Sequence, residues 1–317
     1  MHGVFLDWAT VSAGDVTAQP LESALASLTL HPTSTATEAR ARVGDTEVLL
    51  SNKVAIDAAM LEAAPELRLI CLAATGFDSV DIETARARGI AVCNIRDYCT
   101  DAVAQHVFAL MLALNQHLWD YQRLLRDGAW EGSPQFCLLD HPIHDLSGRT
   151  LVIVGYGTLG RRVAQLGEAF GMRVLIAARP GTAGDSARRP LDELLPQADV
   201  ISLHCPLTDA TRDLIDTAAL ARMQPHAILI NTARGAIVDA GALADALRER
   251  RIGGAGIDVL RQEPPVDGDP LLATDIPNLI VTPHIAWASV EARQRAVDAM
   301  AGNITAFREG QRQNRVD

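Results

Sequence analysis

The chain has 317 residues, 48% of them hydrophobic, and a formal net charge of -11 at pH 7. This length and apolar content favour two folded domains and exclude an intrinsically disordered chain. The acidic excess argues against a nucleic acid or an anionic membrane surface as partner, because both carry negative charge.

The five cysteines show no CxxC spacing, and their number is odd. This usage predicts reduced thiols in a cytoplasmic protein. The N-terminal residues show no basic flank followed by an apolar run, and no apolar stretch is long enough to cross a bilayer. The sequence therefore predicts neither a signal peptide nor a membrane span.

Short apolar runs alternate with helical patterns along the chain, which is typical of α/β proteins with parallel sheets. In the first hundred residues, strands are predicted at residues 4–6, 47–50, 67–72 and 90–94, with helices that include 21–28 and 56–62. A long amphipathic helix is predicted over residues 101–126, after a capping signal at Thr100. An irregular segment at residues 128–147 follows it.

A second series of strands is predicted at residues 150–154, 173–177, 200–204, 227–231, 254–258 and 279–282. The last predicted helix covers residues 289–309 and has no strand after it. The natural division is a first domain of residues 1–99, a second of residues 100–285, and a C-terminal helix that returns to the first. Two such domains leave a cleft between them, where we expect a small ligand.

The predicted strand at residues 150–154 runs directly into the sequence GYGTLG, and a helical pattern follows. In that context the motif predicts a turn that binds the pyrophosphate of a dinucleotide. Gly155 permits the tight turn, Gly157 lets the pyrophosphate approach the backbone, and Gly160 allows close packing of helix on strand. The N-terminus of the helix would supply free N–H groups to the phosphates.

The next strand ends in Ala178, Arg179 and Pro180. An NAD site usually carries an acidic residue at this point, which bonds the ribose 2′-hydroxyl. The nearest acid, Asp185, lies farther along the loop, whereas Arg179 can pair with a 2′-phosphate and the arginines at 188–189 add positive charge. We therefore predict a preference for NADP, with NAD as a possible cofactor; the alternative is that Arg179 is a solvated surface residue.

Arg234, Glu263 and His284 follow three successive predicted strands. Because the carboxyl ends of parallel strands meet at one edge of a sheet, we expect these side chains to converge. Arg234 would hold a substrate carboxylate and polarise its keto oxygen. His284 would protonate the alkoxide that forms on hydride transfer, and Glu263 would favour the charged imidazole and fix its orientation.

Five motifs together resemble the D-isomer-specific 2-hydroxyacid dehydrogenase family over essentially the whole chain: GYGTLG (155–160), LHCPLTDATRDLI (203–215), INTARGAIVD (230–239), GIDVLRQEP (256–264) and TPHIAWAS (282–289). The resemblance implies an α/β fold of two Rossmann-like doubly wound parallel-sheet domains with an inter-domain cleft, usually in a homodimer. Residues 1–99 would form the substrate domain, completed by the C-terminal helix at 286–317, and residues 100–285 the dinucleotide-binding domain.

The resemblance also implies the residues of the site. The family's catalytic arginine, glutamate and histidine fall on Arg234, Glu263 and His284, and its nicotinamide-amide contact falls on Asp258. Its substrate-carboxylate loop falls on Ala74, Thr75, Gly76 and Phe77. The remaining implied cofactor contacts are Thr100, Tyr156, Thr158, Leu159, Cys205, Pro206, Thr211, Thr232 and Ala233.

Within the family, the chain looks most similar to the glycerate dehydrogenase / hydroxypyruvate reductase branch through LSNK (50–53), LICLAATG (69–76), CNIRDYCT (93–100) and SPQFCLLD (133–140). The implied reaction is reduction of hydroxypyruvate or glyoxylate to D-glycerate or glycolate with NAD(P)H. Phe77 departs from the smaller or amide residues of the branch and would reshape the pocket. Lys53 is a candidate second cation for the substrate, and Trp287 a candidate pocket wall.

Two alternatives stay open from the sequence. One is a dehydrogenase for a bulkier 2-keto acid. The other is a dinucleotide-sensing, corepressor-like binding protein on the same fold. Turnover on a panel of 2-keto acids distinguishes them.

The irregular segment contains His141 and His144 in a His-x-x-His pattern. A metal site needs further ligands, and the sequence shows none near them at a useful spacing. No metal is therefore predicted.

Overall fold

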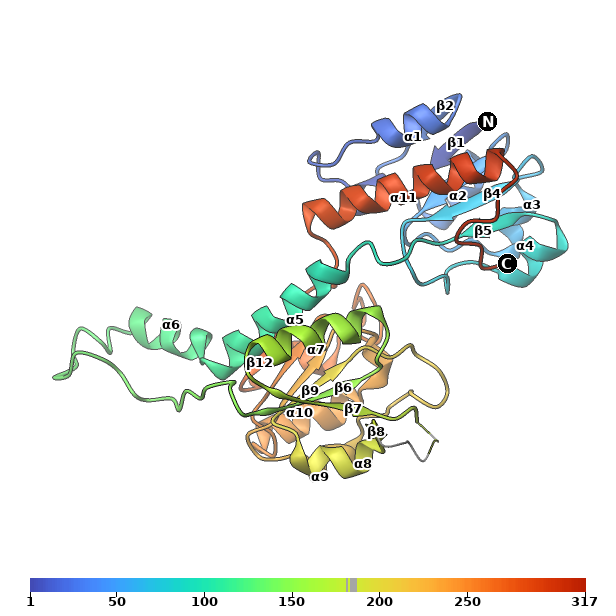
Figure 1. Ribbon diagram of the computed structural model, residues 1–317. Helices are drawn as coiled ribbons and strands as arrows, with labels where there is room; N and C mark the ends of the chain where they lie inside the picture. Colours follow the sequence, from blue (N-terminus) through green and yellow to red (C-terminus); the bar gives the residue numbers. More distant parts are fainter. Residues whose placement is uncertain (181, 183–186) are drawn as a thin grey trace. The chain divides into compact units, whose positions relative to one another are not determined.

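The computed structural model describes residues 1–180, 182 and 187–317, and the chain divides into two compact units (Figure 1). Unit 1 contains Met1–Cys99 and Trp287–Asp317, and unit 2 contains Thr100–Ala286. Unit 1 is therefore assembled from both ends of the sequence, whereas unit 2 is one continuous stretch. Asp185, considered above, lies outside the described residues.

Unit 1 is built on a five-stranded parallel sheet in the order β2-β1-β3-β4-β5. The strands are β1 (His2–Phe5), β2 (Ser27–Leu30), β3 (Val48–Ser51), β4 (Leu69–Leu72) and β5 (Ala91–Cys93). Every residue of β3, β4 and β5 is buried, as expected where both faces of a parallel sheet are covered. The helices between them are α1 (Gln19–Ala24), α2 (Ala36–Arg42), α3 (Ala58–Glu62) and α4 (Ile82–Ala87).

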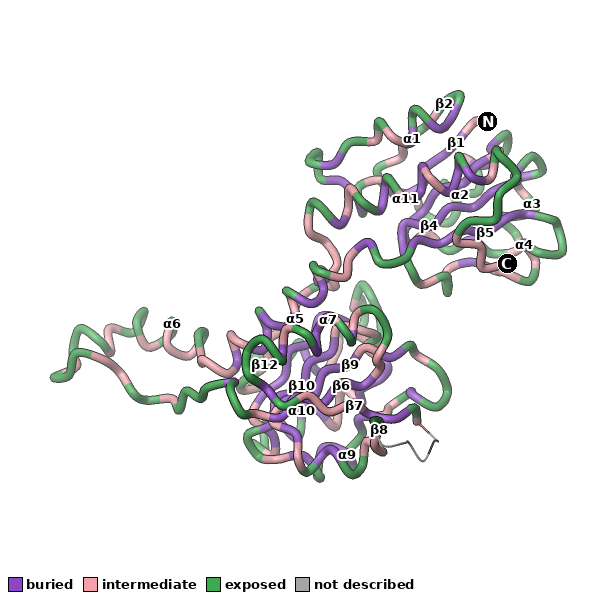
Figure 2. Tube along the Cα trace, in the orientation of Figure 1, coloured by how far each residue is buried: buried purple, intermediate pink, exposed green. Residues whose placement is uncertain are grey.

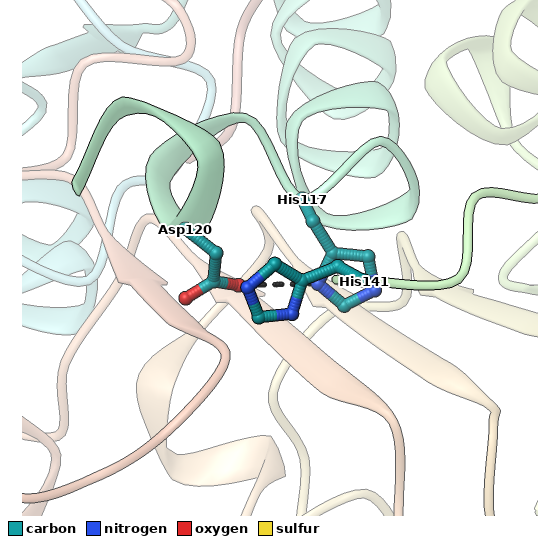
Figure 3. A group of neighbouring side chains, drawn as sticks. All are labelled: His117, Asp120 and His141. Carbon is teal, nitrogen blue, oxygen red and sulfur yellow. Dashed lines mark hydrogen bonds and ion pairs between the residues drawn. The ribbon is translucent and has the colours of Figure 1, made fainter. Parts of the chain in front are cut away.

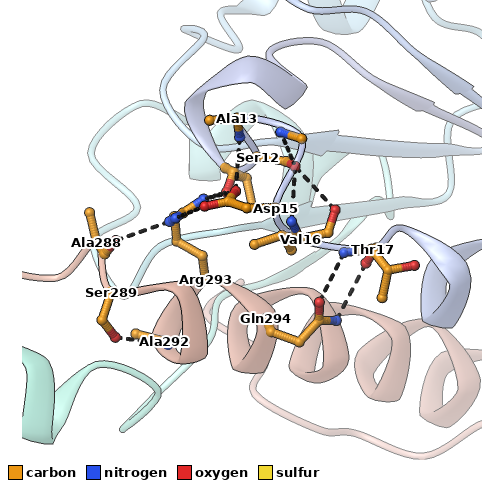
Figure 4. A network of polar contacts seen from close by, with 12 residues as sticks. Ser12, Ala13, Asp15, Val16, Thr17, Ala288, Ser289, Ala292, Arg293 and Gln294 are labelled. Carbon is orange, nitrogen blue, oxygen red and sulfur yellow. Dashed lines mark hydrogen bonds and ion pairs between the residues drawn. The ribbon is translucent and has the colours of Figure 1, made fainter.

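The C-terminal helix α11 (Val290–Arg308) belongs to unit 1, where it packs against α1 and β4. Its first turns are joined to the loop after β1 by polar contacts (Figure 4). The Arg293 guanidinium donates two hydrogen bonds to the Asp15 carboxylate, at 2.7 and 2.6 Å, and Gln294 accepts one from the Thr17 N–H at 3.0 Å. Arg293 holds the pKa of Asp15 well below its ordinary value.

Unit 2 contains a seven-stranded parallel sheet in the order β12-β11-β10-β9-β6-β7-β8. The strands are β6 (Thr150–Val154), β7 (Arg173–Ala177), β8 (Arg188–Arg189), β9 (Val200–Leu203), β10 (Ile228–Asn231), β11 (Gly254–Ile257) and β12 (Leu279–Val281). The direction of winding reverses between β6 and β9, and a dinucleotide binds at such a switch point in doubly wound sheets. Asn231 lies opposite both Leu203 and Ile257, so neighbouring strands end at the same level.

The helices of unit 2 are α5 (Thr100–Asn115), α6 (Leu118–Arg126), α7 (Thr158–Ala169), α8 (Leu191–Leu194), α9 (Thr217–Arg222) and α10 (Ala240–Arg248). α5 packs against α7 and crosses β10, β11 and β12, while α9 and α10 contact each other. The central strands are buried, whereas α6 and the segment after it are exposed or half-buried over most of their length (Figure 2). None of the described helices is long and apolar enough to cross a membrane.

Two predicted helices differ from the structure, and two strands were missed. The helix predicted over residues 101–126 is wrong, because α5 ends at Asn115 and α6 starts at Leu118, with His117 between them in a left-handed conformation (φ 50°). A helix was predicted over residues 21–28, but the observed helix α1 ends at Ala24. The edge strand β2 follows it. β8 was not predicted. Both missed strands lie at sheet edges and carry few buried apolar side chains, so their sequences lack the usual strand pattern.

Candidate active site and cofactor site

The glycine turn joins β6 to α7. Gly155 has a φ of +99°, and a Cβ at this position would lie 2.5 Å from the backbone nitrogen of Cys205. A Cβ at Gly160 would overlap the carbonyl oxygen of Gly155, whereas the space around Gly157 is open. α7 begins at Thr158, and no side chain caps its N-terminus. The first N–H groups of α7 are therefore available to an anion such as a pyrophosphate.

Two buried polar atoms on the same edge of the sheet have no hydrogen-bond partner among the described residues. They are Thr232 Oγ1, just after β10, and His204 Nδ1, just after β9. Buried polar atoms are normally satisfied, and a polar ligand is one way of satisfying them. Together with the glycine turn, they make this edge of unit 2 fit a dinucleotide.

Burial also keeps the His204 side chain neutral over a wider pH range, since it lowers the pKa of the imidazole from 6.5 to about 4. The unfolded chain then binds a proton at a higher pH than the folded protein does. The contribution of His204 to stability is therefore complete above pH 6.5 and lost as the pH falls from 6.5 to about 4. At ~1.4 kcal/mol for each pKa unit, the loss is at most about 3 kcal/mol.

We expect His204→Gln to flatten the pH dependence of the free energy of unfolding between pH 6.5 and about 4. Urea unfolding of both proteins at a series of pH values measures this quantity. Because the two proteins share every other titrating group, the difference between their curves isolates His204. Parallel curves over this interval would show that the imidazole does not stay neutral in the folded protein.

The tip of β7 carries the residues predicted to select the cofactor. Ala178 is buried and its N–H donates to the Arg189 carbonyl at 2.7 Å, while Arg179 is exposed. The Arg189 guanidinium is directed to Glu193 at 3.3 Å, so part of its charge is neutralised. No carboxylate among the described residues pairs with Arg179. Pro180, the next residue, is half-buried.

The other predicted cofactor residues occupy several loops of unit 2. Tyr156 and Leu159 are half-buried in the glycine turn, and Thr100 is the first residue of α5. After β9, Thr211 Oγ1 donates to the Pro206 carbonyl and accepts from the Thr208 N–H, each at 2.7 Å. Thr211 therefore shapes this loop. Cys205, at the start of the loop, is buried, which raises the pKa of its thiol to about 11.

Arg234 lies on the turn after β10, and the side chain of Asn231 shapes this turn. Asn231 Nδ2 donates to the Arg234 carbonyl at 2.9 Å, and Asn231 Oδ1 accepts from the Ala233 N–H at 3.0 Å. A Cβ at Gly235 would overlap the backbone of Leu260, so the loops after β10 and β11 are in close backbone contact. The exposed Arg234 guanidinium donates to the Ala233 carbonyl at 2.7 Å.

Glu263 and His284 form a direct pair. His284 Nδ1 lies 2.6 Å from Glu263 Oε2, and the other carboxylate oxygen accepts from the Leu260 N–H at 2.8 Å. The side chains are 28% and 33% exposed, so the pair remains accessible to solvent and ligands. His284 Nε2 has no partner among the described residues. The imidazole is thus oriented through one nitrogen and free to exchange a proton at the other.

Asp258 organises the backbone around His284. It is 1% exposed, and its carboxylate accepts hydrogen bonds from Thr282 Oγ1 at 2.6 Å and from the N–H groups of Ile285 and Ala286, each at 2.9 Å. The His284 N–H donates to the Asp258 carbonyl at 2.8 Å. These bonds hold the segment in which His284 adopts a left-handed φ of 55°.

His106, on α5, extends this network, because its Nε2 lies 3.0 Å from Thr282 Oγ1 and 3.6 Å from Asp258 Oδ1. Sequence reasoning missed His106 and Thr282. The available signal was a histidine within the largely apolar helix α5. The prediction that Asp258 contacts the nicotinamide amide stays a prediction.

The predicted substrate residues belong to unit 1. Lys53 is exposed just after β3, and its N–H donates to Asp7 at 2.7 Å. Thr75, after β4, donates to the Ile95 carbonyl at 2.9 Å, and Phe77 is 41% exposed. Trp287 packs edge-to-face on Tyr98, with ring centroids 6.1 Å apart. Ala74 is buried and Gly76 half-buried.

The family model described as D-isomer specific 2-hydroxyacid dehydrogenase, NAD binding domain, matches residues 108–286. The chain belongs to the D-isomer specific 2-hydroxyacid dehydrogenases. A glycerate dehydrogenase of Methylorubrum extorquens is 47% identical over 279 residues, which cover 87% of each chain.

Solved structures of similar proteins cover nearly the whole chain. A protein from Thermus thermophilus is similar over 100% of both chains, with a TM-score of 0.86 and 35% identity. An NADPH-dependent glyoxylate/hydroxypyruvate reductase of Sinorhizobium meliloti, solved with NADP and malonate, covers 99% of this chain and 96% of its own, with a TM-score of 0.81 and 28% identity.

These comparisons confirm the family and branch inferred from the motifs, and the two parallel-sheet domains confirm the predicted fold class. The chain is an oxidoreductase that uses a nicotinamide dinucleotide and acts on small 2-keto and 2-hydroxy acids.

The predicted homodimer stays a prediction. Large exposed apolar side chains of the kind found at interfaces gather on α6 and the segment after it, among them Trp119, Trp130, Phe136 and Leu139.

Proposed function

We propose that this dehydrogenase reduces hydroxypyruvate or glyoxylate to D-glycerate or glycolate, with NADPH as its preferred cofactor. The pairing of His284 Nδ1 with Glu263 Oε2 at 2.6 Å carries the proposal, because it supplies an oriented proton donor. A glycerate dehydrogenase as a relative and a glyoxylate/hydroxypyruvate reductase as a structural neighbour support the choice of substrate.

The glycine turn, Thr232 and the tip of β7 would hold the dinucleotide, which when bound supplies a hydride to the keto carbon of the substrate. His284 donates the proton on Nε2 to the oxygen that becomes an alkoxide, and it takes the proton back in the oxidation direction. Glu263 keeps the ring oriented and balances its positive charge. Arg234 binds the substrate carboxylate and polarises the keto oxygen with its guanidinium.

The preference for NADPH rests on Arg179. Its guanidinium is exposed beside the buried end of β7, and no described carboxylate neutralises it. A guanidinium binds a phosphate in a bidentate, charge-assisted manner that a ribose hydroxyl cannot match. A structural neighbour from Sinorhizobium meliloti, an NADPH-dependent reductase solved with NADP, supports this preference.

One experiment tests both parts of the proposal. We expect kcat/KM to be highest for hydroxypyruvate and glyoxylate in a panel that includes pyruvate and phenylpyruvate, and higher with NADPH than with NADH. Arg179→Ala should lower kcat/KM for NADPH about 10-fold or more, because a charge-assisted contact is worth about 1.5–3 kcal/mol, and leave the value for NADH nearly unchanged.

Arg251→Ala is the matched control, because Arg251 is a half-buried arginine of unit 2 that pairs with Glu249. It should leave both cofactors unaffected. Equal or better turnover with NADH in the unaltered protein would overturn the NADPH preference. Highest turnover on phenylpyruvate would point to a bulkier substrate, and no oxidation of NAD(P)H with any 2-keto acid would point to a binding protein.

A further inference from the structure

Three potential metal ligands lie together near the break between α5 and α6 (Figure 3). His117 occupies the break between the helices, Asp120 lies in the first turn of α6, and His141 comes from the irregular segment. One ligand atom from each lies within 4.8 Å of the other two. His117 Nδ1 and Asp120 Oδ2 are 3.1 Å apart, and their side chains are 19% and 20% exposed.

The backbone of the irregular segment is fixed where His141 meets α6. Tyr121 Oη donates to the His141 carbonyl at 2.9 Å and accepts from the His141 N–H at 3.3 Å. The His141 ring lies edge-on to Tyr121 and stacks on His117, with the stacked centroids 5.2 Å apart and the planes at 18°. The three side chains are therefore held near one another by contacts that involve no ion.

From this geometry we propose that His117, Asp120 and His141 bind a divalent transition-metal ion, with Zn²⁺ as the best match. Two imidazole nitrogens and one carboxylate oxygen form a donor set that zinc uses in proteins, and a fourth position is left for water. Ligand atoms around a tetrahedral zinc ion lie about 3.3 Å apart. His117 and Asp120 already meet that spacing, and the His141 nitrogen, which lies within 4.8 Å of both ligand atoms, would move closer to them when the ion binds.

The neighbouring side chains determine which atoms are available as metal ligands. Arg123 donates to Asp120 Oδ1 at 2.9 Å, which leaves Oδ2 facing His117 as the ligand oxygen. His144, the other histidine of the His-x-x-His pattern, is exposed and lies outside the cluster. The sequence pattern therefore contains one member of the site, and its partners come from α6 and the residue before it. The bound ion would tie residues 128–147 to α6.

The test is equilibrium dialysis of the full-length, chelator-treated protein against Zn²⁺, followed by measurement of the metal retained, with Co²⁺ absorption as a report on tetrahedral coordination. We expect one equivalent in the unaltered protein and in His144→Ala, and loss of that equivalent in His141→Ala. His117→Asn should also lose it, and Asn tolerates the left-handed backbone at this position. Circular dichroism checks that each variant is folded.

A second readout is cleavage of residues 128–147 by a protease. Zn²⁺ should slow this cleavage in the unaltered protein and in His144→Ala, but not in His141→Ala, because the ion can no longer fasten the segment. Failure of the unaltered protein to retain zinc would overturn the proposal. So would equal retention by His141→Ala, which would place the ion elsewhere, for instance on a cysteine.

Discussion

His284→Ala should lower kcat for the reduction of hydroxypyruvate by about 100-fold or more while leaving the affinity for NADPH nearly unchanged. The loss follows from the role of the imidazole, since without it the alkoxide must take its proton from water. Cofactor affinity is preserved because the glycine turn and the tip of β7 lie on other loops. Steady-state kinetics and a fluorescence titration of NADPH measure the two quantities.

The backbone of His284 calls for a second variant, because its φ of 55° disfavours alanine. His284→Asn tolerates this conformation and should lose a similar fraction of kcat. His226→Ala is the control for loss of a histidine, since His226 is 46% exposed and pairs with Asp199. Full activity in His284→Asn would remove the proton-transfer role, and a loss in the alanine variant alone would assign the effect to the backbone.

Gly155→Ala should abolish dinucleotide binding and destabilise the protein by about 3 kcal/mol or more. Two costs combine at this position. The φ of +99° strains any residue with a Cβ, and that Cβ would lie 2.5 Å from the backbone nitrogen of Cys205. Because backbone rather than a flexible side chain is in the way, β6 or the loop after β9 must shift. Urea unfolding and NADPH titration report the two effects.

Gly148→Ala separates the two costs. Gly148 also has a positive φ, of +80°, but nothing lies within 4 Å of a Cβ built there. It should cost about 1–2 kcal/mol and leave cofactor binding intact. The difference between the two variants in the free energy of unfolding then measures the cost of the steric clash at position 155. Normal NADPH affinity in Gly155→Ala would mean that the turn does not approach the pyrophosphate as we propose.

The sequence predicted the strands with continuous apolar runs best. β6 and β7 were predicted with the bounds observed, because continuous apolar runs bounded by turn residues are a strong signal. The edge strands β2 and β8 were missed because their sequences lack a continuous apolar run. The break at His117 was also missed, since amphipathic residues continue into α6 although none of them is buried there. Periodicity cannot detect a single left-handed residue.

The same contrast holds for the site. Arg234, Glu263 and His284 were predicted to converge because each follows a parallel strand. Glu263 and His284 lie in direct contact, whereas the Arg234 guanidinium donates to the Ala233 carbonyl. The supporting role of Asp258 could not be predicted, because two of the groups it binds are backbone N–H groups. The cluster at His117 was hidden by the helix that was predicted to pass through it. The pattern of strands predicts which strand ends lie together at the edge of the sheet. It does not predict which backbone groups form hydrogen bonds to the side chains there.

The division of unit 1 between both ends of the sequence has a consequence for synthesis on the ribosome. Residues 100–286 are contiguous and can fold as soon as they emerge, whereas the N-terminal segment must wait for α11. The residues after α11 add to this dependence, since the Val316 N–H donates to the Val92 carbonyl in β5. The residues of unit 1 that precede α5 are thus translated before unit 2 but reach their final packing after it, and translation that stops after residue 286 would yield a complete unit 2 and an unfinished unit 1.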